Sequence, residues 1–150
     1  MLRYSFLPSD HNPMVLMLGE EPDMRMLSEL LRRFSRSPQD VNLSAAYGFA
    51  VSDTEITLSA GEHDLGMHVV SRNDKILRWT LDSSTAELFA ELVEELAEHD
   101  LKSGSERLIC GDYREIPVKV SRGEFTDNYL VFGRGAAAAG PQPDRRVNNE

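Results

Sequence analysis

Two amphipathic helical segments constrain the fold of this chain more than any other feature of its sequence. The first opens with Pro22 and extends to about Ser35, and the second begins at Ser83 or Ser84 with a capping-box pattern and ends near His99. Their apolar faces consist of Leu27, Leu30, Leu31 and Phe34 in the first segment and of Phe89, Leu92, Val93 and Leu96 in the second. Because most of the stability of such helices comes from burying the apolar face, both segments require a sheet or another helix to pack against.

The two helical segments lie in stretches that can be aligned with each other. Residues 14–34 match residues 76–96 at an offset of 62 positions, which pairs Leu27 with Phe89 and Leu30 with Leu92. Shared apolar periodicity alone can produce such a match, so we take from it only an architectural expectation. Each stretch is typical of a strand that runs into a helix, and we expect both helices to pack on one face of a largely antiparallel sheet.

Short strands separated by turn residues are expected in the rest of the chain. The candidate strands are residues 2–7, 14–18, 54–59, 67–71, 75–81, 107–110 and 115–121. Asn73 and Asp74 are typical of a hairpin turn, and Pro117 indicates an edge strand. The sequence therefore predicts an α+β fold in the form of a two-layer sandwich.

The chain length of 150 residues is suited to one domain with a core of its own. From Gly133 onward the sequence contains four consecutive alanines between glycine and proline residues, and Val147 is its only large apolar residue. Such a segment buries too little apolar surface to offset the entropy lost on ordering. We expect a single domain over residues 1–133 and a disordered tail over residues 134–150.

Negative charge is concentrated in the second helical segment. Seven acidic residues and no lysine or arginine lie between Asp82 and Asp100, in a chain whose formal net charge is −9. Spacings of four, three and four place most of these carboxylates on one helix face, where like charges repel. A basic protein partner would relieve that repulsion, and the predicted partner-binding residues are Glu87, Glu91, Glu94, Glu95 and Glu98. The alternative is a solvated face that keeps the protein soluble.

Several classes of protein are disfavoured by composition. The acidic balance argues against a nucleic-acid-binding protein, and no apolar run approaches the roughly 20 residues that a membrane span requires. The N-terminal sequence lacks the features of a signal peptide, so we expect a cytoplasmic protein with no membrane partner. A single cysteine, Cys110, excludes an internal disulfide and a thiolate metal cluster, and we expect it to be a packed core thiol.

The tetrapeptide Glu-His-Asp-Leu occurs twice, at residues 62–65 and 98–101, and raises the question of a metal site. The two contexts differ, because the first copy precedes a strand and the second closes a helix. If a metal site exists, its ligands would come from Glu62, His63, His68, His99 and Asp100. The simpler interpretation is that these histidines lie on the surface, in a polar loop and at a helix end. We predict no metal site, no cofactor and no catalytic residues.

In its small size and acidity the chain resembles small acidic bacterial accessory proteins, including immunity proteins that neutralise basic toxins. The motifs of hydrolases, phosphate-binding loops and dinucleotide-binding folds do not occur in the sequence. We therefore expect a non-catalytic interaction protein with a basic protein partner. The alternatives are a small metal-assisted hydrolase that uses the histidines and a homo-oligomeric structural protein without a ligand.

Overall fold

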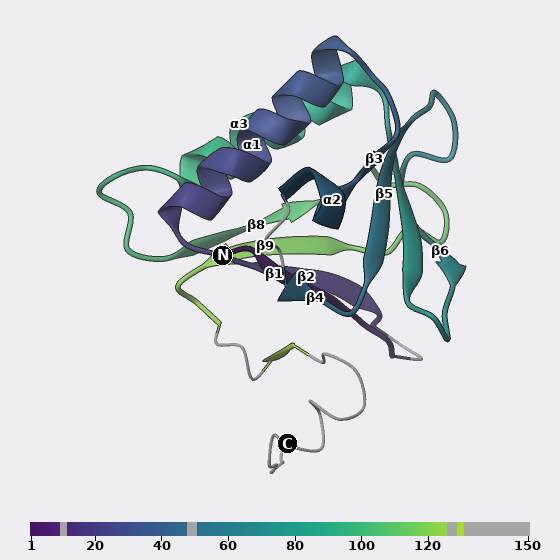
Figure 1. The fold of residues 1–150 in the computed structure, drawn as a ribbon, viewed down its shortest axis with the longest axis horizontal. Coiled ribbons are helices and arrows are strands. Elements are labelled where there is room, and N and C mark those ends of the chain that lie inside the picture. Colours follow the sequence, from purple (N-terminus) through teal and green to yellow (C-terminus); the bar gives the residue numbers. More distant parts are fainter. Residues whose placement is uncertain (10–11, 48–50, 126–128, 131–150) are drawn as a thin grey trace.

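The computed structural model describes residues 1–9, 12–47, 51–125 and 129–130, which form three helices and nine strands. Their order is β1 (Arg3–Leu7), β2 (Met14–Leu18), α1 (Glu21–Arg36), β3 (Val41–Asn42), α2 (Leu43–Tyr47), β4 (Val51–Ser52), β5 (Glu55–Ala60), β6 (Gly66–Ser71), β7 (Ile76–Leu81), α3 (Ser83–Leu96), β8 (Gly104–Leu108) and β9 (Val118–Arg122). The predicted α+β class is confirmed, and the two long helices lie together over one side of the molecule (Figure 1). The predicted tail, residues 134–150, lies outside the described residues.

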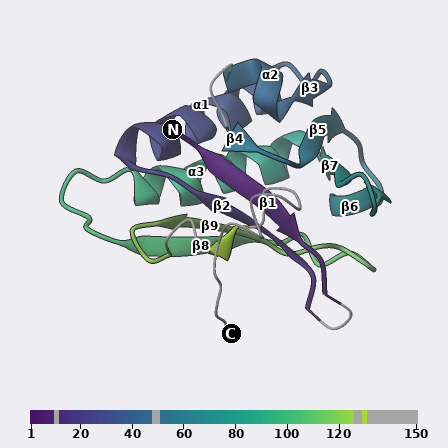
Figure 2. The ribbon, with the colours of Figure 1, turned by 60° about the horizontal axis from the view of Figure 1, so that its bottom comes forward.

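The strands form two sheets rather than the single sheet expected from the sequence. Sheet A has the order β4-β1-β2-β9-β8 and sheet B the order β3-β5-β7-β6, and the strands of one run across those of the other (Figure 1). Within the described residues, three of the seven strand pairings are parallel, those of β1 with β4, β2 with β9 and β5 with β7. Figure 2 brings β1, β2, β8 and β9 of sheet A forward.

The offset of 62 positions also relates the strand pairings, including those of β5 and β9, which lie outside the two aligned segments. Val15 of β2 pairs with Val118 of β9, and the residues 62 positions away, Leu77 of β7 and Ile56 of β5, pair with each other in the same parallel sense. The second half of the chain has the order β6-β7-α3-β8-β9, and the first half has β1-β2-α1 followed by β3, α2, β4 and β5. In each half two strands after the long helix join the sheet of the other half, β3 and β5 in sheet B and β8 and β9 in sheet A, whereas β4 pairs with β1. The match therefore reflects a repeated topology and more than shared periodicity.

Capping groups fix the starts of both long helices. At α3 the Asp82 side chain accepts a hydrogen bond from the Thr85 amide at 2.8 Å, so Asp82 is the cap and the helix starts at Ser83, the earlier of the two predicted starts. Hydrogen bonds from Thr85 hold the pKa of Asp82 below its ordinary value. At α1 the Asp23 carboxylate accepts from the Glu20 amide at 2.8 Å, as in a capping box.

One main core fills the space between the helices and both sheets. It contains the inward residues of β1, β2, β5, β7 and β9 and the apolar faces of α1 and α3. The ring centroids of Trp79 and Phe89 lie 6.1 Å apart, with the two rings tilted by 30°. A second, smaller cluster lies on the outer face of sheet A, where Leu16 and Leu18 are covered by Phe125 and Leu130. Among the described residues, none of the helices combines the length and apolar character that a bilayer span requires.

Candidate interaction surfaces

The predicted acidic site on α3 is divided by an arginine from the neighbouring helix. Arg32 of α1 donates from Nε to Glu87 at 3.1 Å and from Nη2 to Glu94 at 3.2 Å, and Ser35 donates to Glu87 at 3.1 Å. The hydrogen bond from Arg32 lowers the pKa of Glu87, and the pKa of Arg32 is raised in turn. The repulsion expected between these two carboxylates is thus relieved within the chain.

The remaining three predicted residues, Glu91, Glu95 and Glu98, are exposed. Within the described part of the chain none of them forms an ion pair. Glu106 on β8 has its pKa raised, first by burial and then by the negative charge of Glu95. Uncompensated negative charge therefore accumulates where α3 faces the edge of sheet A.

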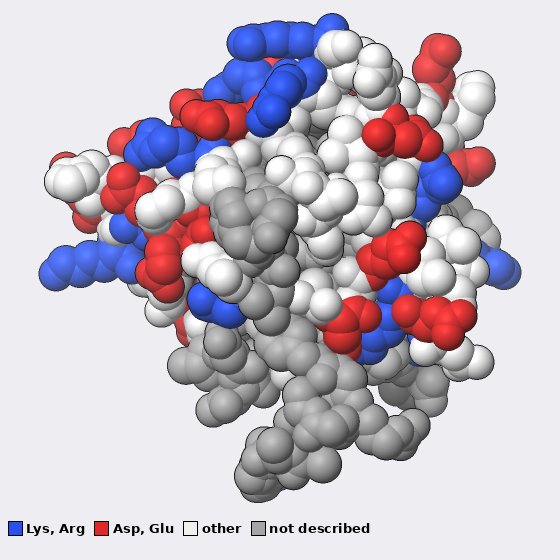
Figure 3. All heavy atoms as spheres, viewed as in Figure 1, with Lys and Arg blue, Asp and Glu red and all other residues white. Residues whose placement is uncertain are grey.

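The C-terminal end of α1 is basic. Arg32, Arg33 and Arg36 surround a shallow pocket with Glu29 on α1, and Figure 3 shows lysine and arginine side chains gathered over this end of the helix. The C-terminal end of α1 and the exposed face of α3 consequently carry charges of opposite sign, and Arg32 pairs only part of that charge.

The two Glu-His-Asp-Leu copies do not form one site. His99 is 91% exposed and lies 3.9 Å from Glu21 at the start of α1, whereas His63 lines a pocket on sheet B together with His68. In the described residues, no three histidine, cysteine or acidic side chains are grouped closely enough to hold a metal ion. Of the five residues considered as ligands, His63 and His68 line this pocket together.

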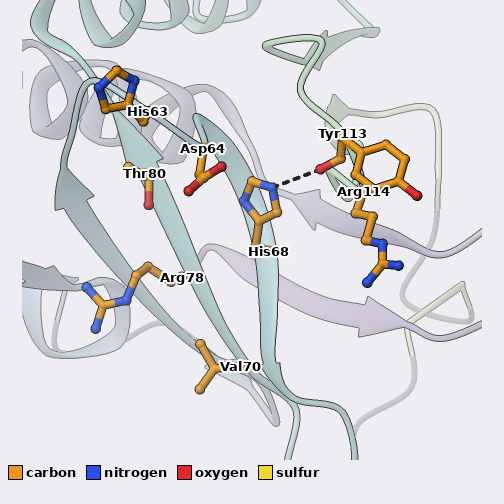
Figure 4. A pocket seen from close by; sticks show the side chains of 8 residues that line it. All are labelled: His63, Asp64, His68, Val70, Arg78, Thr80, Tyr113 and Arg114. Atoms are coloured by element: carbon orange, nitrogen blue, oxygen red, sulfur yellow. Dashed lines mark hydrogen bonds between the residues drawn. The ribbon is translucent and has the colours of Figure 1, made fainter.

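The pocket on sheet B is an open depression of about 570 Å³ on the outer face of β6 and β7. Its lining residues are His63, Asp64, His68, Val70, Arg78, Thr80, Tyr113 and Arg114. His68 links β6 to the loop before β9, because its Nδ1 lies 3.2 Å from the Gly66 carbonyl oxygen and its Nε2 lies 3.4 Å from that of Tyr113. Figure 4 shows Arg78 and Arg114 on either side of His68.

The loop that carries Tyr113 and Arg114 is held by one carboxylate. Glu115 accepts hydrogen bonds from the amides of Cys110 and Gly111 at 2.7 Å and from that of Asp112 at 3.1 Å. Gly66 is required opposite this carboxylate, since its φ is +110° and a Cβ there would lie 2.5 Å from a Glu115 oxygen. The candidate strands 107–110 and 115–121 left these residues as a connection, and nothing in the local sequence except Gly111 before Asp112 indicated a turn that borders a pocket.

Cys110 lies beside Glu115 and has a pKa of about 12. Burial is the largest cause and the negative charge of Glu115 is the next. Little reactive thiolate is present at neutral pH. Cys110 is thus a free, partly buried thiol, less buried than the packed core thiol that the sequence predicted.

A polar network that joins the two sheets was also missed. Lys75, at the start of β7, donates to Asp53 at 2.7 Å and to Ser5 of β1 at 3.2 Å, and Ser5 donates to Asp53 at 2.8 Å. Ser5 is fully buried, so the contact between its hydroxyl and the Lys75 ammonium is out of reach of a substrate. The three residues are 22 or more positions apart, and no local pattern connects them.

No family model, curated protein or solved structure matches this chain.

Proposed function

We propose that this chain is a non-catalytic interaction protein that binds a basic protein partner through the part of α3 that α1 leaves uncompensated. The binding residues are Glu91, Glu95 and Glu98, with Glu106 of β8 beside them. Glu87 and Glu94, expected from sequence to take part, contribute less in this proposal because Arg32 already neutralises them.

The raised pKa of Glu106 is the observation that supports this surface most directly. Its carboxylate is partly buried and feels the charge of Glu95, so its ionised form is less favourable in the free protein than that of an isolated glutamate. A lysine or arginine placed by a partner between Glu95 and Glu106 would stabilise both charges. Electrostatic attraction over the whole acidic face would also speed the encounter.

Two groups of the kinds that serve as nucleophiles are poorly suited to catalysis. The Ser5 hydroxyl, although it contacts Lys75, is fully buried, and the Cys110 thiol has a pKa of about 12. Both groups have evident structural roles in the network between the sheets and in the loop before β9. These arguments favour binding over chemistry.

A cytoplasmic location belongs to the same proposal, as does a partner that is a protein rather than a nucleic acid. The net charge of −9 opposes binding to phosphate backbones. Fractionation of cells that produce the protein would check the location.

The test is a titration of the full chain with a fluorescently labelled helical peptide rich in lysine and arginine. Binding is measured from the fluorescence anisotropy of the peptide and from the amide NMR shifts of the protein. The variant Glu91→Gln, Glu95→Gln and Glu98→Gln should weaken binding by about tenfold or more, and binding should fall steeply with added salt. The matched control replaces the exposed carboxylates Glu55, Glu62 and Glu124 with glutamine, which changes the net charge equally. Equal weakening in both triple variants, or shifts located away from α3 and β8, would reject the proposed surface.

A further inference from the structure

The repeated topology makes the outer faces of the two sheets directly comparable. On sheet A, Ser5 pairs with Leu16 across β1 and β2, and on sheet B His68 pairs with Arg78 across β6 and β7. Arg78 lies 62 positions after Leu16, the same offset that relates the β2–β9 and β7–β5 pairings. The pocket on sheet B is therefore the counterpart of the outer face of sheet A.

The two counterpart faces differ in what covers them. On sheet A, Leu16 and Leu18 are 3% and 2% exposed, because Phe125 and Leu130 from the chain's own C-terminal part pack on them. On sheet B, the equivalent positions hold Arg78 and Thr80, and nearby Val70 is 62% exposed. The fold thus uses this face to seat a polypeptide segment on one sheet and leaves the same place open on the other.

The side chains at the open face define the chemistry of its occupant. The guanidinium carbon of Arg114 lies 5.2 Å from the centre of the Tyr113 ring. Within the described residues Arg114 forms no ion pair. Arg78 lies 3.6 Å from Asp40, but both side chains are at least half exposed, so solvent screens that pair. His63 and His68 add imidazole groups, and Asp64 is the one carboxylate that lines the pocket.

We propose that the outer face of β6 and β7 binds an extended, acidic segment of a partner protein, in the position that Phe125 and Leu130 occupy on sheet A. Carboxylates of the segment pair with Arg78 and Arg114, and one of its apolar side chains packs on Val70 and the Tyr113 ring. The hydrogen bonds of Glu115 and His68 hold the loop that supplies Tyr113 and Arg114, so this wall of the site exists before binding. The site is separate from the acidic surface on α3 and requires a ligand of opposite charge.

The test uses the isotope-labelled full chain and a synthetic peptide of about ten residues in which glutamate alternates with valine, so that the extended peptide has one acidic face and one apolar face. Saturable amide shifts at His68, Val70, Arg78 and Thr80 are expected. A peptide with lysine in place of glutamate should cause none of them. Shifts elsewhere, or equal binding of the lysine peptide, would overturn the proposal.

Two variants, each with a matched control, make the test independent of folding defects. Val70→Glu adds a carboxylate at an exposed position and should weaken binding of the glutamate peptide by about tenfold or more, whereas Leu88→Glu, the same kind of change at a 52% exposed position on α3, should not. Arg114→Gln should weaken binding, and Arg33→Gln on α1 should leave it unchanged. If free glutamate competes as well as the peptide, the site recognises a small anion and the proposal of a polypeptide occupant is wrong.

Discussion

Ser28 and Ala90, which are 62 positions apart in sequence, join the two long helices: the Ser28 hydroxyl donates to the Ala90 carbonyl oxygen at 2.8 Å. Both residues are buried, and their small side chains let α1 and α3 approach closely. The contact lies between equivalent positions of the two halves, so it marks the place where the repeated units meet.

Enlarging Ala90 should destabilise the protein. Ala90→Leu forces extra carbon atoms into the packed interface with α1, and we expect a loss of about 1 to 3 kcal/mol in the free energy of unfolding, measured by urea denaturation. Glu91→Leu places the same side chain at the adjacent exposed position and should change stability by less than about 0.5 kcal/mol. Similar losses in both variants would contradict close packing at Ala90.

Removing the charge of Arg32 should give a stability loss that depends on pH. Folding lowers the pKa of Glu87 from its ordinary value of 4.5, so the stabilisation is present above that value and is lost as the pH falls through the lower pKa of the folded state. Arg32→Gln should therefore be less stable than the parent protein at about pH 7 and closer to it at about pH 3. Urea denaturation at both pH values is the measurement, and a deficit that is the same at both would exclude the ion pairs as its cause.

Arg33→Gln is the matched control for Arg32, because Arg33 is exposed on the same helix. It should leave the urea midpoint unchanged at either pH, since no hydrogen bond or ion pair within the described residues involves its side chain.

Disrupting the network between the sheets should be more costly than disrupting a surface pair. The Lys75 and Asp53 side chains are only 16% and 15% exposed, and Lys75→Met removes the cation from a largely buried carboxylate. We expect a loss of about 3 kcal/mol in the free energy of unfolding. The double variant Lys75→Met with Asp53→Leu should recover part of this loss, because it removes both charges. A double variant less stable than Lys75→Met alone would contradict a purely electrostatic penalty.

The Glu115 carboxylate should control both the loop before β9 and the reactivity of Cys110. Glu115→Gln has one acceptor oxygen for three amides, so amide hydrogen exchange at Cys110, Gly111 and Asp112 should speed up, with a local loss of about 2 kcal/mol. The substitution also removes a negative charge that raises the pKa of Cys110. Alkylation of the thiol by iodoacetamide should become faster.

The pH dependence of alkylation gives the sign of this effect. A lower pKa for the Cys110 thiol moves the rise in alkylation rate to lower pH in Glu115→Gln than in the parent protein. Glu55→Gln, at an exposed position on β5, serves as the control and should leave the profile unchanged. An unchanged profile in both variants would mean that the charge of Glu115 does not raise the thiol pKa.

The sequence by itself determined the local elements of this fold. The apolar spacing of α1 and α3, the alternation in β5 and β7 and the position of most strands act over a few neighbouring residues, and they were enough to predict an α+β domain with two helices on one side. It also located the acidic surface of α3, because charge spacing on a helix is a local property.

Tertiary structure alone decided how those elements combine. Backbone hydrogen bonds form in the same way whatever the side chains are, so the local sequence does not indicate that β2 pairs with β9 or β5 with β7. The division into two sheets, each containing strands from both halves of the chain, was therefore not predicted. The same holds for Arg32, which neutralises Glu87 from 55 positions away, and for Tyr113, whose carbonyl oxygen lies 3.4 Å from His68 Nε2. These contacts depend on which packing of the whole chain buries the most apolar surface, a property that no short segment contains.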